Sequence, residues 1–261
     1  MIIPSVYIIG SGNLAWHLSD GLREAGIAIN GIIARNATQG KTLAKKNNCK
    51  RYNSIAEIPF GKGLFFCCVS DDAIDDVVKQ IPLKEAVVIH CSGMHPINHS
   101  TGINDKRSYG VFYPVQSFNK KLKVEWRDIP VCIEAADMVT EKLLTGIAKK
   151  FAGKVYKLDS PTRAYVHLAA VFANNFSNAQ FAIAQEILLA KNVGFEILRP
   201  LILQTSAKVQ HALPDTVQTG PAIRNDERTI RAHKKLLKET PEPGKIYSDL
   251  TRFIQHHFKK Q

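Results

Sequence analysis

Short apolar segments rich in Val, Ile and Phe recur through the first half of the chain, and stretches with helical spacing separate them. Strands are predicted at residues 6–9, 27–34, 64–69, 86–90, 108–113 and 130–133. Strands that alternate with helices are typical of βαβ units, which build a parallel sheet. Residues 64–69, Leu-Phe-Phe-Cys-Cys-Val, are apolar at every position, as a strand covered on both faces must be. The pattern therefore predicts an α/β fold of Rossmann type: a mostly parallel sheet with helices on both faces.

The pattern changes near residue 157, because helical spacing then continues without a comparable strand signal. A proline follows Ser160, which predicts Ser160 as the N-cap of a long helix that runs to Asn192. Further helices are expected at residues 195–210, 226–238 and 246–258. The chain therefore divides into an α/β domain, residues 1–157, and an all-helical C-terminal domain, residues 158–261.

The strongest local motif, Gly10-Ser11-Gly12-Asn13-Leu14-Ala15, follows the first predicted strand and opens a helix. In dinucleotide-binding folds the first glycine permits a tight turn, and the second lets the backbone approach a pyrophosphate. The N-terminus of the helix presents free N–H groups to the phosphates. The alternative is a strand-to-helix turn that merely needs two glycines. The βαβ alternation that follows favours a dinucleotide site, which we assign to Gly10, Ser11, Gly12, Asn13 and Leu14.

The residue at the end of the second strand selects between NAD and NADP. NAD enzymes place Asp or Glu there, against the ribose hydroxyls, whereas this chain has Ala34-Arg35-Asn36. A guanidinium can pair with the 2′-phosphate of NADP, and no carboxylate repels that phosphate. We therefore expect NADP, with Arg35 and Asn36 in the cofactor site; a solvated arginine at a strand end is the alternative for Arg35.

Two more polar loops follow predicted strands: residues 69–72, Val-Ser-Asp-Asp, and residues 91–93, Cys-Ser-Gly. Ligands of open α/β sheets bind outside the carboxyl ends of the strands. Val69, Ser70 and Ser92 are therefore added to the expected cofactor site. Capping of the next helix is an equally good interpretation for Ser70 and the two aspartates.

Four motifs, at residues 8–15, 113–118, 167–176 and 219–226, resemble the bacterial Rossmann-like proteins whose C-terminal half is domain of unknown function 2520. The resemblance covers nearly the whole chain. It implies an NADP-binding domain similar to those of pyrroline-5-carboxylate reductase and deazaflavin-dependent NADP oxidoreductases. It also implies a helical domain similar to the C-terminal domains of 6-phosphogluconate dehydrogenase-like enzymes. Tyr113 stands where the family often has histidine, and its higher ordinary pKa, near 10 against about 6.5, would alter a role in proton transfer.

The long predicted helix carries polar side chains on an apolar background. His167, Asn174 and Asn178 share one helical face by spacing, whereas Asn175, the position that matches the family's asparagine, lies about 80° round the helix from His167. A nicotinamide enzyme needs a group that gives or takes a proton, and histidine titrates near neutral pH. We therefore expect His167 to act as the general acid and Asn174 or Asn175 to orient the substrate. The alternative for His167 is a half-buried histidine bonded to a neighbour.

Gln116 and Ser117 are expected to line the nicotinamide end of the cleft, with Gln116 near the substrate. Arg224, in a predicted loop, has the planar fork that binds a carboxylate through two hydrogen bonds. A surface arginine is the alternative for Arg224. Asp226 is expected to cap the helix that follows it.

Composition and charge limit the class of partner. The 261 residues contain 35 Lys and Arg against 23 Asp and Glu, a net charge of +12, which favours an anionic partner. No nucleic-acid-binding motif appears, and the basic residues are scattered. Six Asn, Gln and Glu residues interrupt the longest apolar stretch, residues 168–188, so no membrane span is expected. Five cysteines without a C-x-x-C pair, and a start without the features of a signal peptide, favour a cytoplasmic protein with neither disulfides nor a metal site.

Together these features predict an NADP-dependent oxidoreductase that acts on a small, anionic carbonyl or imine compound. A ketopantoate-reductase-like enzyme is one concrete version, and a non-catalytic NADP-binding or sensing protein is the alternative. The long apolar helix is expected to bury one face against a second subunit, which predicts a homodimer.

Overall fold

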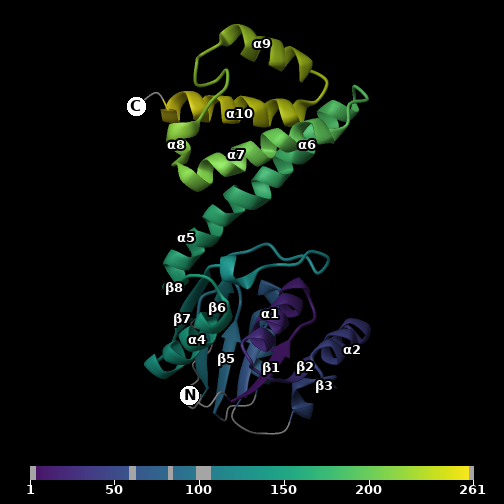
Figure 1. Cartoon of the computed structure of the whole chain (residues 1–261), viewed down its shortest axis with the longest axis vertical. Coiled ribbons are helices and arrows are strands. Elements are labelled where there is room, and N and C mark those ends of the chain that lie inside the picture. Colours follow the sequence, from purple (N-terminus) through teal and green to yellow (C-terminus); the bar gives the residue numbers. More distant parts are fainter. Residues whose placement is uncertain (1–3, 59–62, 82–84, 98–106, 259–261) are drawn as a thin grey trace. The chain divides into compact units, whose positions relative to one another are not determined.

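The computed structural model describes residues 4–58, 63–81, 85–97 and 107–258 (Figure 1). The chain forms two compact units, Met1–Asn175 and Phe176–Gln261. This division falls inside the long helical segment, whereas the predicted division at residue 157 follows the last strand. The domain boundary at residue 157 therefore stays a prediction.

The first unit is built on one eight-stranded sheet with the order β3-β2-β1-β4-β5-β6-β7-β8. The strands are β1 Ser5–Ile9, β2 Ile29–Ile33, β3 Lys50–Tyr52, β4 Gly63–Cys67, β5 Ala86–His90, β6 Ser108–Pro114, β7 Val131–Ala135 and β8 Val155–Lys157. All neighbours run parallel except β6 and β7, which are antiparallel. The predicted mostly parallel sheet is confirmed. The pattern missed β3 and β8, because strands of three residues with lysine or arginine among them leave no apolar run.

Helices cover both faces of this sheet, as predicted. They are α1 Asn13–Glu24, α2 Ala37–Lys46, α3 Ile74–Gln80 and α4 Met138–Phe151. Alternate side chains of a strand point to opposite faces, so the core divides into two apolar clusters. Leu18 of α1 and Leu144 of α4 lie in one cluster, and Ile74 of α3 lies in the other.

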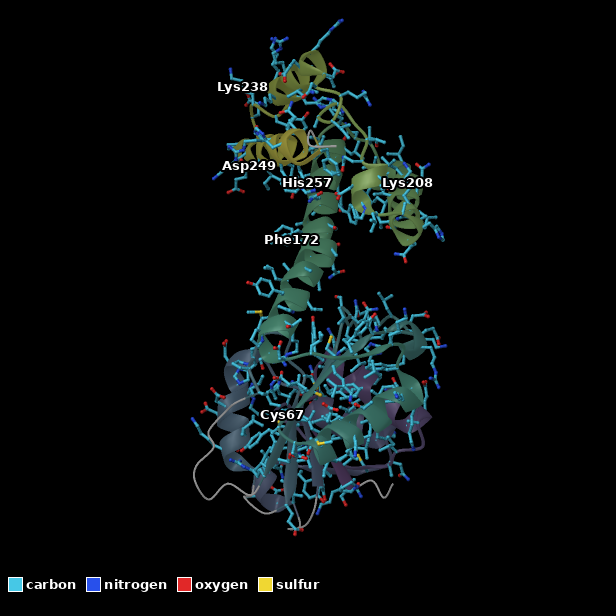
Figure 2. All side chains as sticks on the ribbon, turned by 90° about the vertical axis from the view of Figure 1, so that its left-hand side faces the viewer. Cys67, Phe172, Lys208, Lys238, Asp249 and His257 are labelled. Atoms are coloured by element: carbon cyan, nitrogen blue, oxygen red, sulfur yellow. The ribbon has the colours of Figure 1, made fainter. Side chains whose placement is uncertain are left out.

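Two adjacent cysteines at the end of β4 illustrate this alternation. Cys67 belongs to one cluster and Cys68 to the other, and both are buried free thiols. Figure 2 shows Cys67 inside the α/β unit. Burial raises the pKa of the Cys67 thiol, because a thiolate is poorly solvated there. Both cysteines therefore pack in the core, on opposite faces of the sheet.

The long helix is confirmed, with an irregular centre. It consists of α5 Ser160–Ala170, a π-helical turn Val171–Phe176 and α6 Ser177–Leu189. The prediction of Ser160 as N-cap is wrong: Asp159 caps the helix, and its Oδ1 accepts from the Thr162 N–H at 2.9 Å. The Ser160 hydroxyl donates to Glu134 Oε2 at 2.8 Å and so does not cap the helix. The helix also ends before the predicted Asn192, which has a left-handed backbone with φ of 55°.

The second unit is helical, as predicted. After a short 3₁₀ turn, Phe195–Leu198, it contains α7 Arg199–His211, α8 Pro214–Val217, α9 Glu227–Leu236 and α10 Pro241–His257. α10 begins before the predicted residue 246, since proline is tolerated in a first turn, where its missing N–H costs no hydrogen bond. Asp226 caps α9 by accepting from the Thr229 N–H at 3.0 Å, which confirms its predicted role. None of the helices in the described ranges has both the length and the apolar composition of a membrane span.

Candidate functional site

The loop between β1 and α1 has the shape that a dinucleotide phosphate requires. Gly10 has a φ of 117°, and a Cβ there would lie 2.2 Å from the Cys68 carbonyl oxygen, so only glycine fits. At Gly12, in contrast, a Cβ would meet no heavy atom within 4 Å. Gly12 is the N-cap of α1, no side chain caps this helix, and its first turn carries no acidic residue. The exposed N–H groups and the open space at Gly12 therefore fit a pyrophosphate.

A cavity of about 240 Å³ lies beside this loop at the carboxyl ends of β1 and β2. Its lining residues are Ile9, Gly10, Ile33, Arg35, Asn53, Ser54, Ile55, Ala73, Asp76, Val77 and Gln80. The apolar members suit a flat heteroaromatic ring such as adenine, and Arg35 brings the expected cation to the same cavity. The predicted neighbour Asn36 caps α2, since its Oδ1 accepts from the Gln39 N–H at 3.0 Å. The lining residues within 53–55 and 73–80 were not predicted from the sequence, because no sequence motif marks them.

The loops after β4 and β5 hold the other expected cofactor residues. Val69 and Ser70 follow β4, and Ser70 precedes a 3₁₀ turn without capping it through its side chain. The Ser92 hydroxyl donates to Asp71 Oδ2 at 2.8 Å and accepts from the backbone N–H groups of Met94 and His95. Ser92 thus joins the two loops to each other. Its contact with a cofactor stays a prediction.

A tyrosine and a histidine form the most suggestive polar pair of the first unit. The Tyr113 hydroxyl, near the end of β6, lies 3.2 Å from Nδ1 of His167 in α5. Gly93 makes room for this histidine, because a Cβ there would lie 2.7 Å from His167 Nδ1. Burial raises the pKa of Tyr113 above its ordinary value, Cys132 adds to the shift, and the Arg163 guanidinium opposes it. Tyr113 therefore holds its proton at neutral pH and stays a neutral hydrogen-bonding partner of His167.

This pair lines a cavity of about 440 Å³ together with both candidate asparagines. The full lining is Tyr113, Val115, Gln116, Ser117, His167, Ala170, Val171, Ala173, Asn174 and Asn175. The π-helical turn contains both Asn174 and Asn175, and such wide turns recur at functional sites. Asn178, expected on the same face, lines a separate cavity of about 540 Å³ in the second unit. The expectation assumed a regular α-helix, whereas a π turn, Val171–Phe176, lies between His167 and Asn178.

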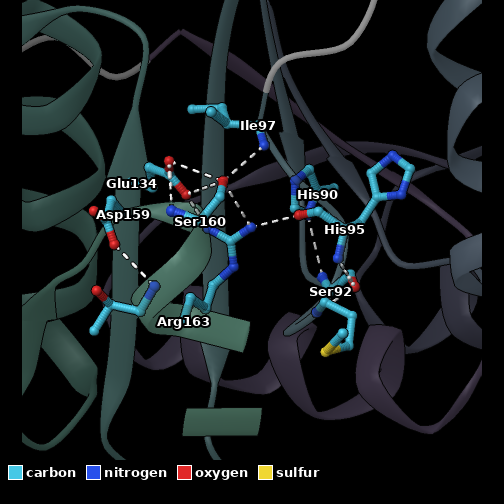
Figure 3. Close-up of polar contacts among 10 residues, drawn as sticks. His90, Ser92, His95, Ile97, Glu134, Asp159, Ser160 and Arg163 are labelled. Carbon is cyan, nitrogen blue, oxygen red and sulfur yellow. Dashed lines mark hydrogen bonds and ion pairs between the residues drawn. The ribbon is translucent and has the colours of Figure 1, made fainter. Parts of the chain in front are cut away.

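A buried arginine fixes the start of α5, one turn before His167 (Figure 3). Arg163 is fully buried, forms an ion pair with Glu134 of β7, and donates to the backbone carbonyl of His95. Ser160 donates to the same carboxylate and accepts from the Ile97 N–H at 3.0 Å. The network ties α5 to β7 and to the loop after β5. No sequence motif marks this network, because its contacts join α5 to residues 26 to 68 positions earlier in the chain.

The last predicted site residue, Arg224, lies in the second unit, where it is exposed in the turn before α9. Its predicted contact with substrate stays a prediction. Across the part of the chain that the structure describes, no three His, Cys, Asp or Glu side chains gather where they could hold a metal ion.

The sheet order, the glycine loop and the adjoining cavity define a Rossmann-type dinucleotide-binding fold followed by a helical domain. Residues 129–254 match the family described as domain of unknown function DUF2520. The crystal structure of a Bacteroides fragilis protein described as a "putative NADP oxidoreductase" is 35% identical, with 97% of this chain and 98% of that chain covered and a TM-score of 0.87. The chain therefore belongs to this family of Rossmann-like proteins with a DUF2520 domain, as the motifs predict.

More distant structures share the fold. A reductive aminase from Aspergillus terreus, in complex with NADPH and ethyl levulinate, is 13% identical over 99% of this chain and 95% of that chain, with a TM-score of 0.70. Pyrroline-5-carboxylate reductase from Coxiella burnetii is 17% identical over 99% and 98%, with a TM-score of 0.54. Comparison with curated proteins gives no significant match.

Proposed function

We propose that this protein is an NADP-dependent oxidoreductase that reduces the C=O or C=N bond of a small anionic compound. The observation that carries the proposal is the Tyr113–His167 pair on the wall of a cavity that two asparagines also line. The NADPH-bound reductive aminase and the pyrroline-5-carboxylate reductase, which share the fold, support this reaction class.

The cofactor is assigned to the glycine loop. The backbone of Gly10–Leu14 would hold the pyrophosphate, and Arg35 would pair with the 2′-phosphate. When bound, NADPH supplies the hydride that reduction of a double bond requires. Val69, Ser70 and Ser92 are proposed to border the bound dinucleotide from the neighbouring strand ends.

The chain's own residues supply the proton. Hydride addition to carbon must be matched by a proton on the oxygen or nitrogen of the same bond, and His167 is the proposed donor. The Tyr113 hydroxyl, which burial keeps protonated, can orient the His167 ring through the 3.2 Å hydrogen bond to its Nδ1. Asn174 and Asn175 have amides that can orient the reacting group, and Gln116 and Arg224 are proposed to bind the rest of the substrate.

We also propose that the protein is a homodimer, because the second unit has almost no core of its own. Among its described residues only Ala222, Ile230 and Thr251 are buried. Leu203 and Leu213 of this unit are 71% and 73% exposed. Large exposed apolar surfaces mark interfaces, and a second copy of the chain supplies a matching apolar surface. Light scattering after size exclusion tests this, with a monomer as the contradicting result.

Turnover is tested by following NADPH oxidation with a panel of small keto acids and cyclic imines. His167→Ala should lower turnover by about 10²–10⁴-fold while the Kd for NADPH stays within about twofold of wild type, because His167 is not assigned to the cofactor. Tight NADPH binding without turnover on any compound of the panel would instead favour the non-catalytic, NADP-sensing alternative.

A further inference from the structure

A lysine that no motif marks lies against the glycine loop. Lys120 belongs to the segment that follows β6, and buried contacts hold this segment against α1. His17, 4% exposed, donates from Nε2 to the Asn119 carbonyl at 2.9 Å, and the indole N–H of Trp126 donates to the His17 carbonyl at 2.9 Å. The Phe118 ring stacks on His17 at a centroid distance of 5.4 Å. The position of Lys120 is therefore fixed by the packing of its neighbours.

The ammonium of Lys120 contacts only neutral acceptors among the described residues. Its Nζ donates to the Ser11 carbonyl at 2.6 Å and to Gln39 Oε1 at 3.4 Å. Lys46 lies over the same Trp16 ring as Lys120, but its ammonium forms an ion pair with Asp20 at 2.6 Å, so its charge is neutralised. Within the described ranges, no carboxylate lies within ion-pair distance of Lys120. A positive charge thus remains unneutralised beside a loop built for phosphate.

The contact with Gln39 indicates which phosphate this charge meets. Gln39 lies in the first turn of α2, and its backbone N–H donates to Asn36, the residue next to Arg35. This turn carries no acidic residue, and the Ser11 hydroxyl also reaches Gln39 Oε1, at 3.5 Å. Gln39 therefore connects the glycine loop, Lys120 and the segment where the adenosine ribose is expected.

We propose that Lys120 binds the 2′-phosphate of NADP(H) and, with Arg35, selects it over NAD(H). This rests on the proposed function, because it assumes that the glycine loop binds a dinucleotide. A second cation suits a phosphate monoester, which carries close to two negative charges at neutral pH. The preference for NADP(H) over NAD(H) thus depends on Lys120 in the loop after β6 as well as on Arg35 at the end of β2.

The test is a titration of wild type, Lys120→Met, Lys120→Arg and Lys121→Met with NADPH, NADH, 2′,5′-ADP and 5′-ADP. Lys121 is the matched control, because it is an exposed lysine of the same segment. Lys120→Met should weaken NADPH and 2′,5′-ADP by about tenfold and leave NADH and 5′-ADP unchanged. Lys120→Arg should keep the preference, since the charge is retained, and Lys121→Met should bind like wild type.

Two results would overturn the assignment while leaving the proposed function intact. Unchanged NADPH affinity in Lys120→Met would show that the ammonium does not touch the cofactor. Equal weakening of NADPH and NADH would place it at the pyrophosphate instead. A wild-type protein that binds neither dinucleotide would overturn the proposed function itself, and the assignment of Lys120 with it. Equal circular dichroism spectra and melting temperatures for the four proteins exclude misfolding as the cause.

Discussion

Replacing Arg163 with methionine should destabilise the protein strongly, because it removes one member of a buried ion pair. The Arg163 side chain is 0% exposed and that of Glu134 is 14% exposed. Loss of one partner from a buried pair costs about 3–5 kcal/mol, since the other charge stays buried without compensation. Glu134 keeps two hydrogen bonds from Ser160, from its N–H at 3.0 Å and its hydroxyl at 2.8 Å. We therefore expect a loss at the lower end, about 3 kcal/mol.

A double-mutant cycle separates this charge effect from lost packing. Glu134→Gln alone should also destabilise, because it leaves the Arg163 guanidinium buried and unpaired. The double variant Glu134→Gln/Arg163→Met buries neither charge, so its cost should fall below the sum of the single variants by about 2 kcal/mol. Urea unfolding, followed by circular dichroism, measures all three differences against wild type.

The control is Arg252→Met, which removes an arginine from an exposed pair. Arg252 and Asp249 are 2.8 Å apart, with side chains 71% and 52% exposed. Exposed pairs contribute less than about 1 kcal/mol, so this variant should unfold almost like wild type. If Arg163→Met cost no more than Arg252→Met, or if the cycle were additive, the assignment of Arg163 as a charge-paired anchor of α5 would be wrong.

Three further predictions concern the candidate site. Gly12→Ala should fold with wild-type stability, because a Cβ at this position meets no heavy atom within 4 Å. In a fluorescence titration it should bind NADPH at least about tenfold more weakly, since the methyl group would occupy the space of the pyrophosphate. Gly93→Ala should lower kcat and leave the Kd for NADPH unchanged, because the new Cβ displaces His167; equal kcat would contradict this. Tyr113→Phe should lower kcat, because the His167 ring loses the hydrogen bond that orients it. Because burial raises the pKa of Tyr113, the pH–rate profile of wild type should show no loss from tyrosine ionisation below about pH 10, and such a loss at neutral pH would contradict a protonated Tyr113 beside His167.

The fold was largely predictable because its signals are local. An apolar run such as residues 64–69 identifies a buried strand without knowledge of its neighbours, and Gly10 and Gly12 predict a phosphate loop from their place between a strand and a helix in a βαβ pattern. The long helix was predictable for the same reason, but its π turn was not. No residue type or spacing in the sequence marks the turn Val171–Phe176, which contains both Asn174 and Asn175 of the cavity lining.

The site was less predictable because its contacts are tertiary. His167 could be selected as a polar residue on an apolar helix, but its partner Tyr113 lies 54 residues away on another element. Nothing in the sequence pairs the two. Lys120 shows the same limit, since only the folded chain reveals that it reaches Ser11, 109 residues earlier.

The Arg163 network explains why the chemistry does not follow the change of pattern at residue 157. Tyr113 and Glu134 precede this point, whereas Arg163 and His167 follow it, and both contacts lie inside the compact unit Met1–Asn175. Cutting the chain at residue 157 would therefore remove His167 from Tyr113 and leave the Glu134 carboxylate without its guanidinium. The sequence pattern groups α5 with the helical C-terminal domain, whereas in the structure α5 belongs to the compact unit that contains the sheet. The ion pair that docks this helix lies one turn from its histidine, so stability and the proposed proton transfer would both depend on one arginine.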